Sequence, residues 1–336
     1  MFKKKLGFLV GVMLIMSLAG YLICLMAGSS KQWKEDEEFL LVTSFYPMYI
    51  LAENLTEGVE GVTVANLTEN QTGCLHDYQL TSRDMKLLSR ADAFLVNGAG
   101  MELFMEKVLE HTDGLPVIEA SHGIALLEGE EHSHNHGEEH AAEEDGHEAE
   151  YETDHETNHG ETDHQGHSHA ENGHVWMDVE RYRKQAATVT EELKRLLPEQ
   201  ENALNEAAKA YDEKLQTLLQ YAEEIKKNTQ GKHVVIFHEA FAYLAESLGM
   251  EVLVSLSLDE ESLPSAGELA EVIEEINYHG GAYLFIEREY AEYADKILRE
   301  TNAAAFYLNP LTTGDGTADS YYKDMWKNLD TLGILK

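Results

Sequence analysis

Hydrophobic positions in the first third of the chain form short unbroken runs, and these alternate with segments of helical periodicity. Four apolar runs predict buried strands, and the segments between them predict helices. The predicted strands cover residues 39–45, 62–67, 93–96 and 116–118, and the predicted helices cover residues 48–55, 82–88 and 101–111. Because strands that alternate with helices form parallel βαβ units, we expect residues 31–127 to form an α/β lobe.

The same alternation starts again at residue 233. Its predicted strands cover residues 233–237, 251–254, 282–286 and 304–307, and its predicted helices cover residues 239–248, 269–278, 291–301 and 321–332. Residues 231–336 therefore predict a second α/β lobe of similar size. The expected fold class is α/β, with two parallel-sheet lobes.

Between the two predicted lobes, residues 174–230 carry a helical pattern. Apolar side chains recur at steps of three and four over residues 182–196 and again over residues 204–225. Pro198 interrupts the pattern and suits the first position of the second helix. At ~1.5 Å per residue, that helix is about 45 Å long and can join both lobes rigidly. A coiled-coil arm that pairs with another chain is the alternative, and we disfavour it because charges do not clearly flank an apolar seam.

Residues 1–30 have the layout of an export signal or a membrane anchor. Three lysines at positions 3–5 precede an apolar run over residues 6–27, which is roughly 30 Å long as a helix and can cross a bilayer. Small residues at positions 27–29 suit cleavage by a signal peptidase, whereas Cys24 is a candidate lipidation site with bulky neighbours. Each alternative places the rest of the chain outside the cytoplasm. It is then either tethered to the outer face of the cell membrane, or secreted or periplasmic after cleavage.

Charge adds a strong excess of acid to this picture. The chain has 62 Asp and Glu against 25 Lys and Arg, a formal net charge of −37, which excludes nucleic acid as a partner. Two cysteines in 336 residues rule out a disulfide-stapled scaffold. Residues 128–173, the His-rich segment, hold sixteen acidic residues, no Lys or Arg, and ten of the 17 histidines. Those ten are His132, His134, His136, His140, His147, His155, His159, His164, His167 and His169.

The His-rich segment has almost nothing to bury. We therefore expect it to form a disordered loop on the surface of the first lobe. Two interpretations of its role stay open. The segment either collects zinc weakly near the protein, or it is a solvated tether whose metal affinity is incidental.

Seven histidines lie outside the His-rich segment, and three of them share a setting that suits a metal ion. His76 comes after the second predicted strand, His174 stands where ordered chain resumes, and His238 directly follows a strand. Ligands of open α/β sheets bind beyond the carboxyl ends of strands, and three neutral imidazoles with an open fourth position suit zinc. Three of the other four histidines, His111, His233 and His279, are assigned to structural positions. His122 is left undecided.

Six motifs follow one another in a specific order along the chain. They are Thr43-Ser44-Phe45-Tyr46-Pro47, His76-Asp77-Tyr78, Asn97-Gly98-Ala99-Gly100-Met101-Glu102, His174-Val175-Trp176-Met177-Asp178, Phe237-His238-Glu239-Ala240-Phe241 and the closing Tyr321-Tyr322 with Met325-Trp326-Lys327-Asn328-Leu329. Together they resemble the zinc-binding solute receptors of metal ABC importers, a family of substrate-binding proteins that take up zinc or manganese. The resemblance covers nearly the whole chain from residue 39 onward. It implies two lobes joined by a rigid long helix, a metal site in the cleft, and a His-rich loop just before the second ligand.

The resemblance also implies the metal ligands. Carried over by position, His76, His174 and His238 fall on the family's histidine ligands. Many manganese-binding members have a carboxylate at the third of these positions. His238 therefore favours Zn²⁺ as the bound ion, with Mn²⁺ as the alternative.

A fourth ligand is less well defined by the motifs. Members of the family with a fourth protein ligand take an Asp or Glu from the last loop, where this chain has Asn309, a weak ligand. Glu287, which follows a predicted strand, is a candidate for a fourth or supporting position. Cys74 is another candidate, although a small unligated cysteine is the simpler interpretation. Water is the remaining candidate for the fourth position.

The resemblance implies that the chain captures Zn²⁺ outside the cell and delivers it to the membrane subunit of an ABC permease. We expect a monomer that is not an enzyme and that meets the membrane through an anchor or a lipid. A receptor for manganese or another divalent metal, and a metal-dependent surface adhesin, are alternatives that the same site allows. An exported zinc hydrolase is a weaker alternative, because Ala242 stands where a His-Glu-x-x-His motif needs its second histidine.

Overall fold

The computed structural model describes residues 39–68, 75, 78–102, 105, 114–129, 171–256 and 264–335. The expected export or anchor segment, most of the predicted helix over residues 101–111, and all ten histidines of the His-rich segment lie outside these residues. The chain divides into two units at residue 38, and all described residues belong to the second unit. Among them, no helix has both the length and the apolar character that a membrane span requires.

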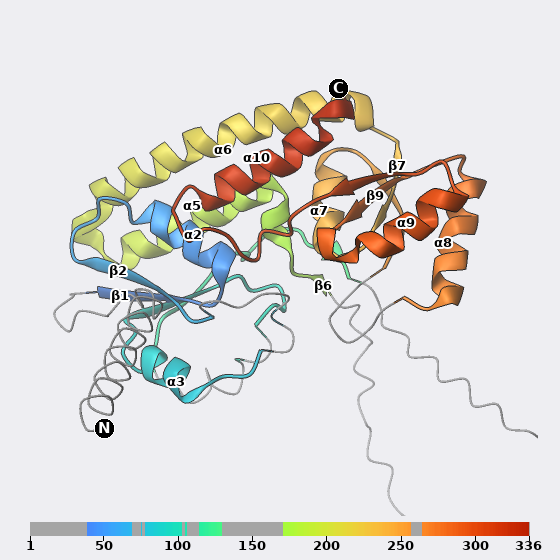
Figure 1. The fold of residues 1–336 in the computed structure, drawn as a ribbon. Coiled ribbons are helices and arrows are strands. Elements are labelled where there is room, and N and C mark those ends of the chain that lie inside the picture. The colour runs from blue at the N-terminus through green and yellow to red at the C-terminus, as the bar shows by residue number, and fades with distance from the viewer. Residues whose placement is uncertain are drawn as a thin grey trace, which may run out of the picture. The chain divides into compact units, whose positions relative to one another are not determined.

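The first lobe is built on a parallel four-stranded sheet with the strand order β2-β1-β3-β4. Its strands are β1 (Phe39–Thr43), β2 (Val62–Asn66), β3 (Ala93–Val96) and β4 (Val117–Glu119), and its described helices are α2 (Tyr46–Leu55) and α3 (Ser82–Leu88) (Figure 1). Leu41 pairs with Val64 on one side and with Ala93 on the other, so the apolar runs meet at the centre of the sheet. The predicted strands therefore form as parallel neighbours.

The second lobe has another parallel sheet, with the order β10-β9-β7-β8. It consists of β7 (His233–Ile236), β8 (Glu251–Ser255), β9 (Tyr283–Ile286) and β10 (Ala304–Tyr307), with α7 (Ala240–Ser247), α8 (Ala266–Tyr278) and α9 (Ala291–Glu300). Val235 and Leu284 belong to the core under α8 and α9, whereas Val234 and Phe285 belong to the core shared with the first lobe. This alternation explains why both faces of the sheet are apolar. The two sheets confirm the expected α/β fold class.

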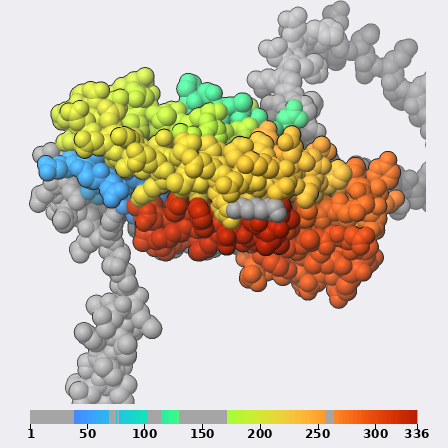
Figure 2. All heavy atoms as spheres, turned by 90° about the horizontal axis from the view of Figure 1, so that it is seen from above, coloured from blue at the N-terminus to red at the C-terminus, as the bar shows by residue number. Residues whose placement is uncertain are grey.

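The linking region is mostly helical. It comprises η3 (Val175–Met177), α5 (Val179–Leu196), η4 (Pro198–Gln200) and the 29-residue α6 (Glu201–Thr229), which is about 43 Å long. Pro198 opens a short 3₁₀ turn, and α6 begins directly after it. In Figure 2, α6 lies between α5 and the C-terminal helix α10 (Ser320–Leu332). Among the helices, α6 contacts these two most extensively. The apolar face of α6 is buried within its own chain, so the coiled-coil alternative is wrong.

Buried aromatic residues hold η3 between the elements around it. The rings of Tyr182 and Tyr321 stack with centroids 3.9 Å apart. Tyr321 Oη donates a hydrogen bond to Trp176 O at 2.8 Å, and Trp176 Nε1 donates to Pro310 O at 2.9 Å. Tyr182 Oη donates to Pro47 O at 3.0 Å. These bonds connect α2, α5, α10 and the loop after β10, so η3 is fixed from several directions.

A short antiparallel pair joins the two ends of the His-rich segment. Its strands are β5 (Leu127–Glu128) and β6 (Glu171–Asn172). Leu127 pairs with Asn172, and Glu128 pairs with Glu171. The prediction that residues 128–173 form one loop is therefore too wide at both ends. Each of these strands has only two residues, which is too short to show a hydrophobic period, so the sequence pattern does not reveal the pairing.

Candidate metal centre

Two of the predicted ligands, His174 and His238, lie together in the interior. Their ring centroids are 5.0 Å apart, and their planes meet at 72°. His174 is 2% exposed and His238 is 9% exposed. A zinc ion bound by two imidazole nitrogens in a tetrahedral site lies about 3 Å from each ring centroid, which places the centroids about 5 Å apart. The observed centroid spacing is therefore the one expected of two ligands of one metal ion.

Each of these histidines stands at the end of a regular element. His238 comes two residues after the end of β7 and precedes α7, and His174 follows β6 and precedes η3. Phe237 N donates a hydrogen bond to Phe285 O at 2.9 Å, so the chain leaves the sheet beside β9. His238 thus lies beyond the carboxyl end of a parallel strand, where α/β folds bind their ligands.

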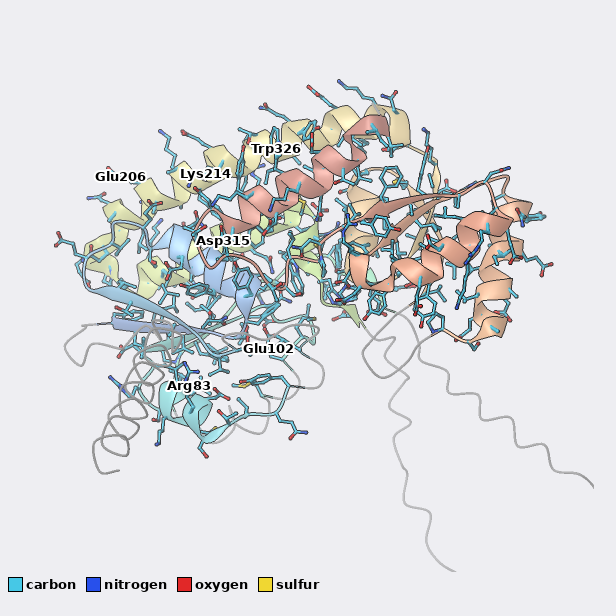
Figure 3. All side chains as sticks on the ribbon, in the orientation of Figure 1. Arg83, Glu102, Glu206, Lys214, Asp315 and Trp326 are labelled. Carbon is cyan, nitrogen blue, oxygen red and sulfur yellow. The ribbon has the colours of Figure 1, made fainter. Side chains whose placement is uncertain are left out.

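The turn after β3 holds the chain just ahead of η3. Asn97 Nδ2 donates a hydrogen bond to Gly173 O at 2.9 Å. A Cβ at position 173 would lie 2.5 Å from Met101 Cγ, so glycine permits this close approach. The carboxylate of Glu102, labelled in Figure 3, accepts hydrogen bonds from the N–H groups of Asn97 at 2.7 Å and Gly98 at 3.0 Å. The motif after β3 therefore positions the segment that leads into the first buried histidine.

Glu287 brings a carboxylate to the histidine pair. It follows β9, the sheet neighbour of β7, and its Oε1 lies 3.5 Å from His238 Nδ1. Its side chain is 21% exposed. Burial, together with repulsion from Glu289, raises the pKa of Glu287 to about 7. A carboxylate oxygen beside imidazole nitrogens is a donor set that zinc accepts.

His76 and Cys74 lie outside the described residues, so their places in the candidate centre stay predictions. Leu75, which stands between them in the sequence, is described and is buried in the main core. Across the described ranges, no group of three or more His, Cys, Asp or Glu side chains is arranged to hold a metal ion.

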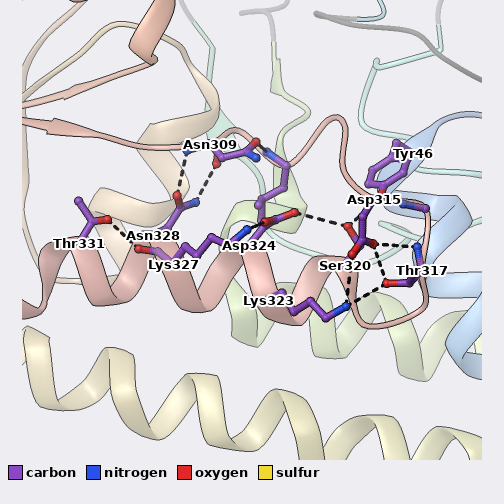
Figure 4. Close-up of polar contacts among 12 residues, drawn as sticks. Tyr46, Asn309, Asp315, Thr317, Ser320, Lys323, Asp324, Lys327, Asn328 and Thr331 are labelled. Atoms are coloured by element: carbon purple, nitrogen blue, oxygen red, sulfur yellow. Dashed lines mark hydrogen bonds and ion pairs between the residues drawn. The ribbon is translucent and has the colours of Figure 1, made fainter.

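Asn309 has a structural role in the loop after β10. Its Oδ1 accepts a hydrogen bond from Leu311 N at 2.7 Å, and Leu311 has a positive φ of 64°. Its backbone N–H donates to Asn328 Oδ1 at 2.9 Å, and its carbonyl accepts from Asn328 Nδ2 at 2.7 Å (Figure 4). The side-chain oxygen that a metal ion would need is thus engaged within the loop, and the backbone of Asn309 holds the loop to α10.

The other described histidines have different surroundings. The rings of His233 and His279 are 4.5 Å apart, and each approaches a glutamate, at 3.7 Å to Glu251 and 3.1 Å to Glu275. These contacts lie at the start of β7 and the end of α8, in agreement with the predicted structural positions. His122 is exposed in the turn after β4. His111 lies outside the described residues.

The sequence pattern did not single out Asn172, which contacts the first of the two buried histidines. Asn172 Oδ1 lies 2.9 Å from His174 Nδ1 and also accepts a hydrogen bond from His174 N–H at 3.0 Å. Asn172 Nδ2 donates to Glu239 O at 2.9 Å. The residue sits at the end of a low-complexity stretch, where an isolated asparagine gives no signal. Its place two residues before a candidate ligand is the one feature that could have identified it.

Sequence comparison relates the chain to proteins of zinc uptake. A family profile described as "Zinc-uptake complex component A periplasmic" matches residues 41–333. The chain is 29% identical over 326 residues to the zinc-binding lipoprotein AdcA of Streptococcus pneumoniae (strain ATCC BAA-255 / R6), across 94% of this chain and 59% of the relative. It is 27% identical over 346 residues to the high-affinity zinc uptake system protein ZnuA of Bacillus subtilis (strain 168), across 99% of this chain and 98% of the relative. The chain thus spans less than two thirds of the AdcA sequence and almost all of the ZnuA sequence.

Solved structures share the fold. The Zn(II)-bound AdcA of Streptococcus pneumoniae superposes with a TM-score of 0.65 and 25% identity, across 88% of this chain and 57% of the other. The Ni²⁺ complex of FpvC from Pseudomonas aeruginosa superposes with a TM-score of 0.69 and 22% identity, across 89% of this chain and 96% of the other. The second likeness concerns the fold alone.

Proposed function

The chain belongs to the zinc-uptake complex component A family, and we propose that it is an extracytoplasmic receptor that captures Zn²⁺ and delivers it to an ABC permease. The observation that carries this proposal is the burial of His174 against His238, with ring centroids 5.0 Å apart. The family consists of substrate-binding receptors, so zinc is cargo here and no chemical transformation is required. The names of the relatives AdcA and ZnuA support zinc as that cargo.

The proposed ligands are three imidazoles and one carboxylate. His174 and His238 supply two nitrogens, His76 supplies the third, and Glu287 supplies an oxygen. Zinc prefers four tetrahedral ligands of this kind, and the negative carboxylate partly offsets the charge of a buried dication. The 3.5 Å separation of Glu287 Oε1 and His238 Nδ1 supports Glu287 over Asn309, whose side-chain oxygen is engaged in its own loop.

A nitrogen-rich ligand set also sets the choice of metal. Imidazole suits zinc, whereas manganese prefers carboxylate, carbonyl and water oxygens. We therefore propose Zn²⁺ as the physiological ion. A receptor for Mn²⁺ is the alternative, and FpvC, a protein of the same fold, has been solved with both Ni²⁺ and Mn²⁺.

The ligand set is tested by zinc titration of the full chain in competition with a chromophoric chelator, which reports the tight site separately from weak binding. We expect His76→Ala, His174→Ala and His238→Ala each to abolish tight binding, because each removes a nitrogen from a four-ligand site. His122→Ala is the matched control, since His122 is exposed and its substitution should leave the affinity unchanged. Tight binding by the His174→Ala/His238→Ala double variant would refute the proposed site.

The cellular setting follows from the same proposal. The apolar N-terminal segment is proposed to keep the receptor at the outer face of the membrane, where a monomer can pass zinc to the permease. Fractionation of cells that express the full chain tests the first part. Recovery of the chain in the cytosolic fraction would contradict it.

A further inference from the structure

Asn172 uses every polar atom of its side chain at the candidate metal centre. It is the last residue of β6 and is 2% exposed. Its Oδ1 faces the backbone N–H of His174 at 3.0 Å and the ring Nδ1 of His174 at 2.9 Å. Its Nδ2 donates to the carbonyl of Glu239 at 2.9 Å. Since Glu239 directly follows His238, one buried amide connects the two segments that carry the histidines.

These bonds determine which way the amide points. A carbonyl such as Glu239 O only accepts, so the amide nitrogen must face it. The backbone N–H of His174 only donates, so the amide oxygen must face His174. Two independent contacts therefore assign the same orientation to Asn172. The assignment does not depend on telling the oxygen from the nitrogen of the amide by position alone.

The orientation of the amide then determines the tautomer of His174. An amide oxygen cannot donate, so His174 Nδ1 must carry the proton of the 2.9 Å contact. In a neutral imidazole this places the ring lone pair on Nε2, the atom that binds the metal. Hydrogen bonds of this kind to a ligating histidine fix its ring orientation and increase its basicity.

The backbone of Asn172 is held as firmly as its side chain. Tyr243 Oη donates a hydrogen bond to Asn172 O at 2.6 Å and accepts one from Leu127 N at 3.1 Å. The guanidinium of Arg181 lies over the Tyr243 ring, 5.0 Å from its centroid. The phenol therefore bridges β5 and β6 and ties both strands to α7. The amide is therefore held through its backbone as well as through its side chain.

We propose that Asn172 is the positioning residue of the zinc centre, which holds His174 in the Nδ1-protonated tautomer and joins its segment to that of His238. This inference rests on the proposed function, because it assumes that His174 binds zinc. It goes further in assigning a role to a residue that does not itself contact the ion. The test therefore separates the orientation of the histidine from the presence of the ligand.

The tautomer is tested directly on the full chain without metal, labelled with ¹⁵N-histidine. Long-range ¹H–¹⁵N correlation spectra distinguish the two tautomers, and the signals that disappear in His174→Gln identify His174. We expect the Nδ1-protonated form in the unchanged protein. A His174 ring protonated at Nε2, or at both nitrogens, at pH 8 would overturn the proposal without any variant having to fold.

Two substitutions of Asn172 distinguish the role of its side-chain oxygen from that of its side-chain nitrogen. Asn172→Leu removes both polar atoms, and we expect it to abolish the tautomer preference and to weaken tight zinc binding by roughly 10–100-fold. Asn172→Asp keeps an acceptor for His174 Nδ1, and we expect it to retain the tautomer and an affinity closer to that of the unchanged protein. Asn54→Leu is the matched control, since Asn54 is also 2% exposed and donates two hydrogen bonds to Ile50 O and Ala318 O. This control should lose stability and keep the tautomer.

The outcomes distinguish this inference from the proposed function. If His174→Ala abolishes tight binding but Asn172→Leu leaves both the tautomer and the affinity unchanged, Asn172 has no positioning role. If His174→Ala itself leaves tight binding unchanged, the ligand assignment fails instead.

Discussion

Glu287 Oε1 lies 3.5 Å from His238 Nδ1. Removing the negative charge of Glu287 therefore tests whether this side chain contributes to the proposed zinc centre. We expect Glu287→Gln to weaken zinc binding by roughly 10–100-fold, because the amide keeps the size of the side chain and loses the charge that offsets the dication. Zinc affinity measured in competition with a chelator checks this. Glu289→Gln makes the same charge change two residues away and should leave the affinity close to normal. Equal losses in both variants would mean that net charge, and not ligation, is responsible.

Glu102 is a second carboxylate in unusual surroundings, and it predicts a pH dependence of stability. Burial raises its pKa to about 7, although Ser44 Oγ and the N–H groups of Asn97 and Gly98 donate to it. Between the unfolded pKa, near 4.3, and about 7, the folded state binds more protons than the unfolded state, so this group lowers the unfolding free energy as pH rises. The full loss above pH 7 is about 4 kcal/mol.

Urea denaturation of the metal-free protein at pH 5, 6, 7 and 8 measures this contribution. Glu102→Gln serves as the reference because it cannot ionise there. The variant loses an acceptor for Gly98 N–H, which should cost about 1–3 kcal/mol at pH 5. Its disadvantage should shrink as pH rises to 8, because only the unchanged protein then carries a buried negative charge. Parallel pH profiles for the two proteins would contradict the raised pKa.

At the scale of elements, the start of α5 supports the turn that follows His174. Asp178 is the N-cap, and its Oδ1 accepts hydrogen bonds from Glu180 N at 2.8 Å and Arg181 N at 3.1 Å. Asp178→Ala should therefore cost about 1–2 kcal/mol of unfolding free energy in urea denaturation. It should also weaken zinc binding, since η3 lies between His174, its N-cap, and Asp178, its C-cap.

The capping box of α3 offers the control for this prediction. Thr81 accepts a hydrogen bond from Asp84 N, and Asp84 accepts one from Thr81 N in return. Thr81→Ala should cost about 1 kcal/mol and leave zinc affinity unchanged. If both variants lose stability and neither loses affinity, the cap of α5 stabilises the fold without helping to place His174.

Most elements could be predicted because their signals are local. The run over residues 234–237 is uniformly apolar, and most of it belongs to β7, a central strand with a neighbouring strand on each side. The boundaries were less accurate in places: Pro198, predicted as the first position of the long helix, opens a 3₁₀ turn before α6. Hydrophobic period identifies an element, whereas its last turn depends on single hydrogen bonds.

The candidate site could be predicted only in part, for the same physical reason. His238 was found because it follows a strand in the sequence, and that placement needs no knowledge of distant contacts. Tyr243, and the bond of Asn172 to Glu239, could not be found, because these contacts join segments far apart in the chain. The pairing of Leu127 with Asn172, which creates this part of the site, has no local pattern.

At the scale of the whole molecule, the β5–β6 pair separates residues 129–170, which hold the ten histidines, from the candidate metal centre. Glu128 and Glu171 are directly paired, so a two-residue Asn-Gly turn can replace residues 129–170 and close the hairpin. We expect this short replacement to retain the tight zinc site, because Asn172, Gly173 and their contacts remain. Weakly bound zinc should decrease, since the ten histidines of the segment are removed.

For a wider replacement, of residues 128–173, we expect the tight zinc site to be weakened. Comparing the two replacements shows which residues the site requires. The wider replacement removes Asn172, which bonds to His174, and Gly173, whose carbonyl accepts from Asn97 Nδ2. At a thousandfold excess of zinc over its Kd, a tight site stabilises the native state by about 4 kcal/mol. Thermal unfolding with and without zinc should show this gain for the full chain and the short replacement, and a clearly smaller gain for the wide one. If the short replacement loses the gain as well, the tight site includes residues between 129 and 170, and the separation of these residues from the centre at β5–β6 is wrong.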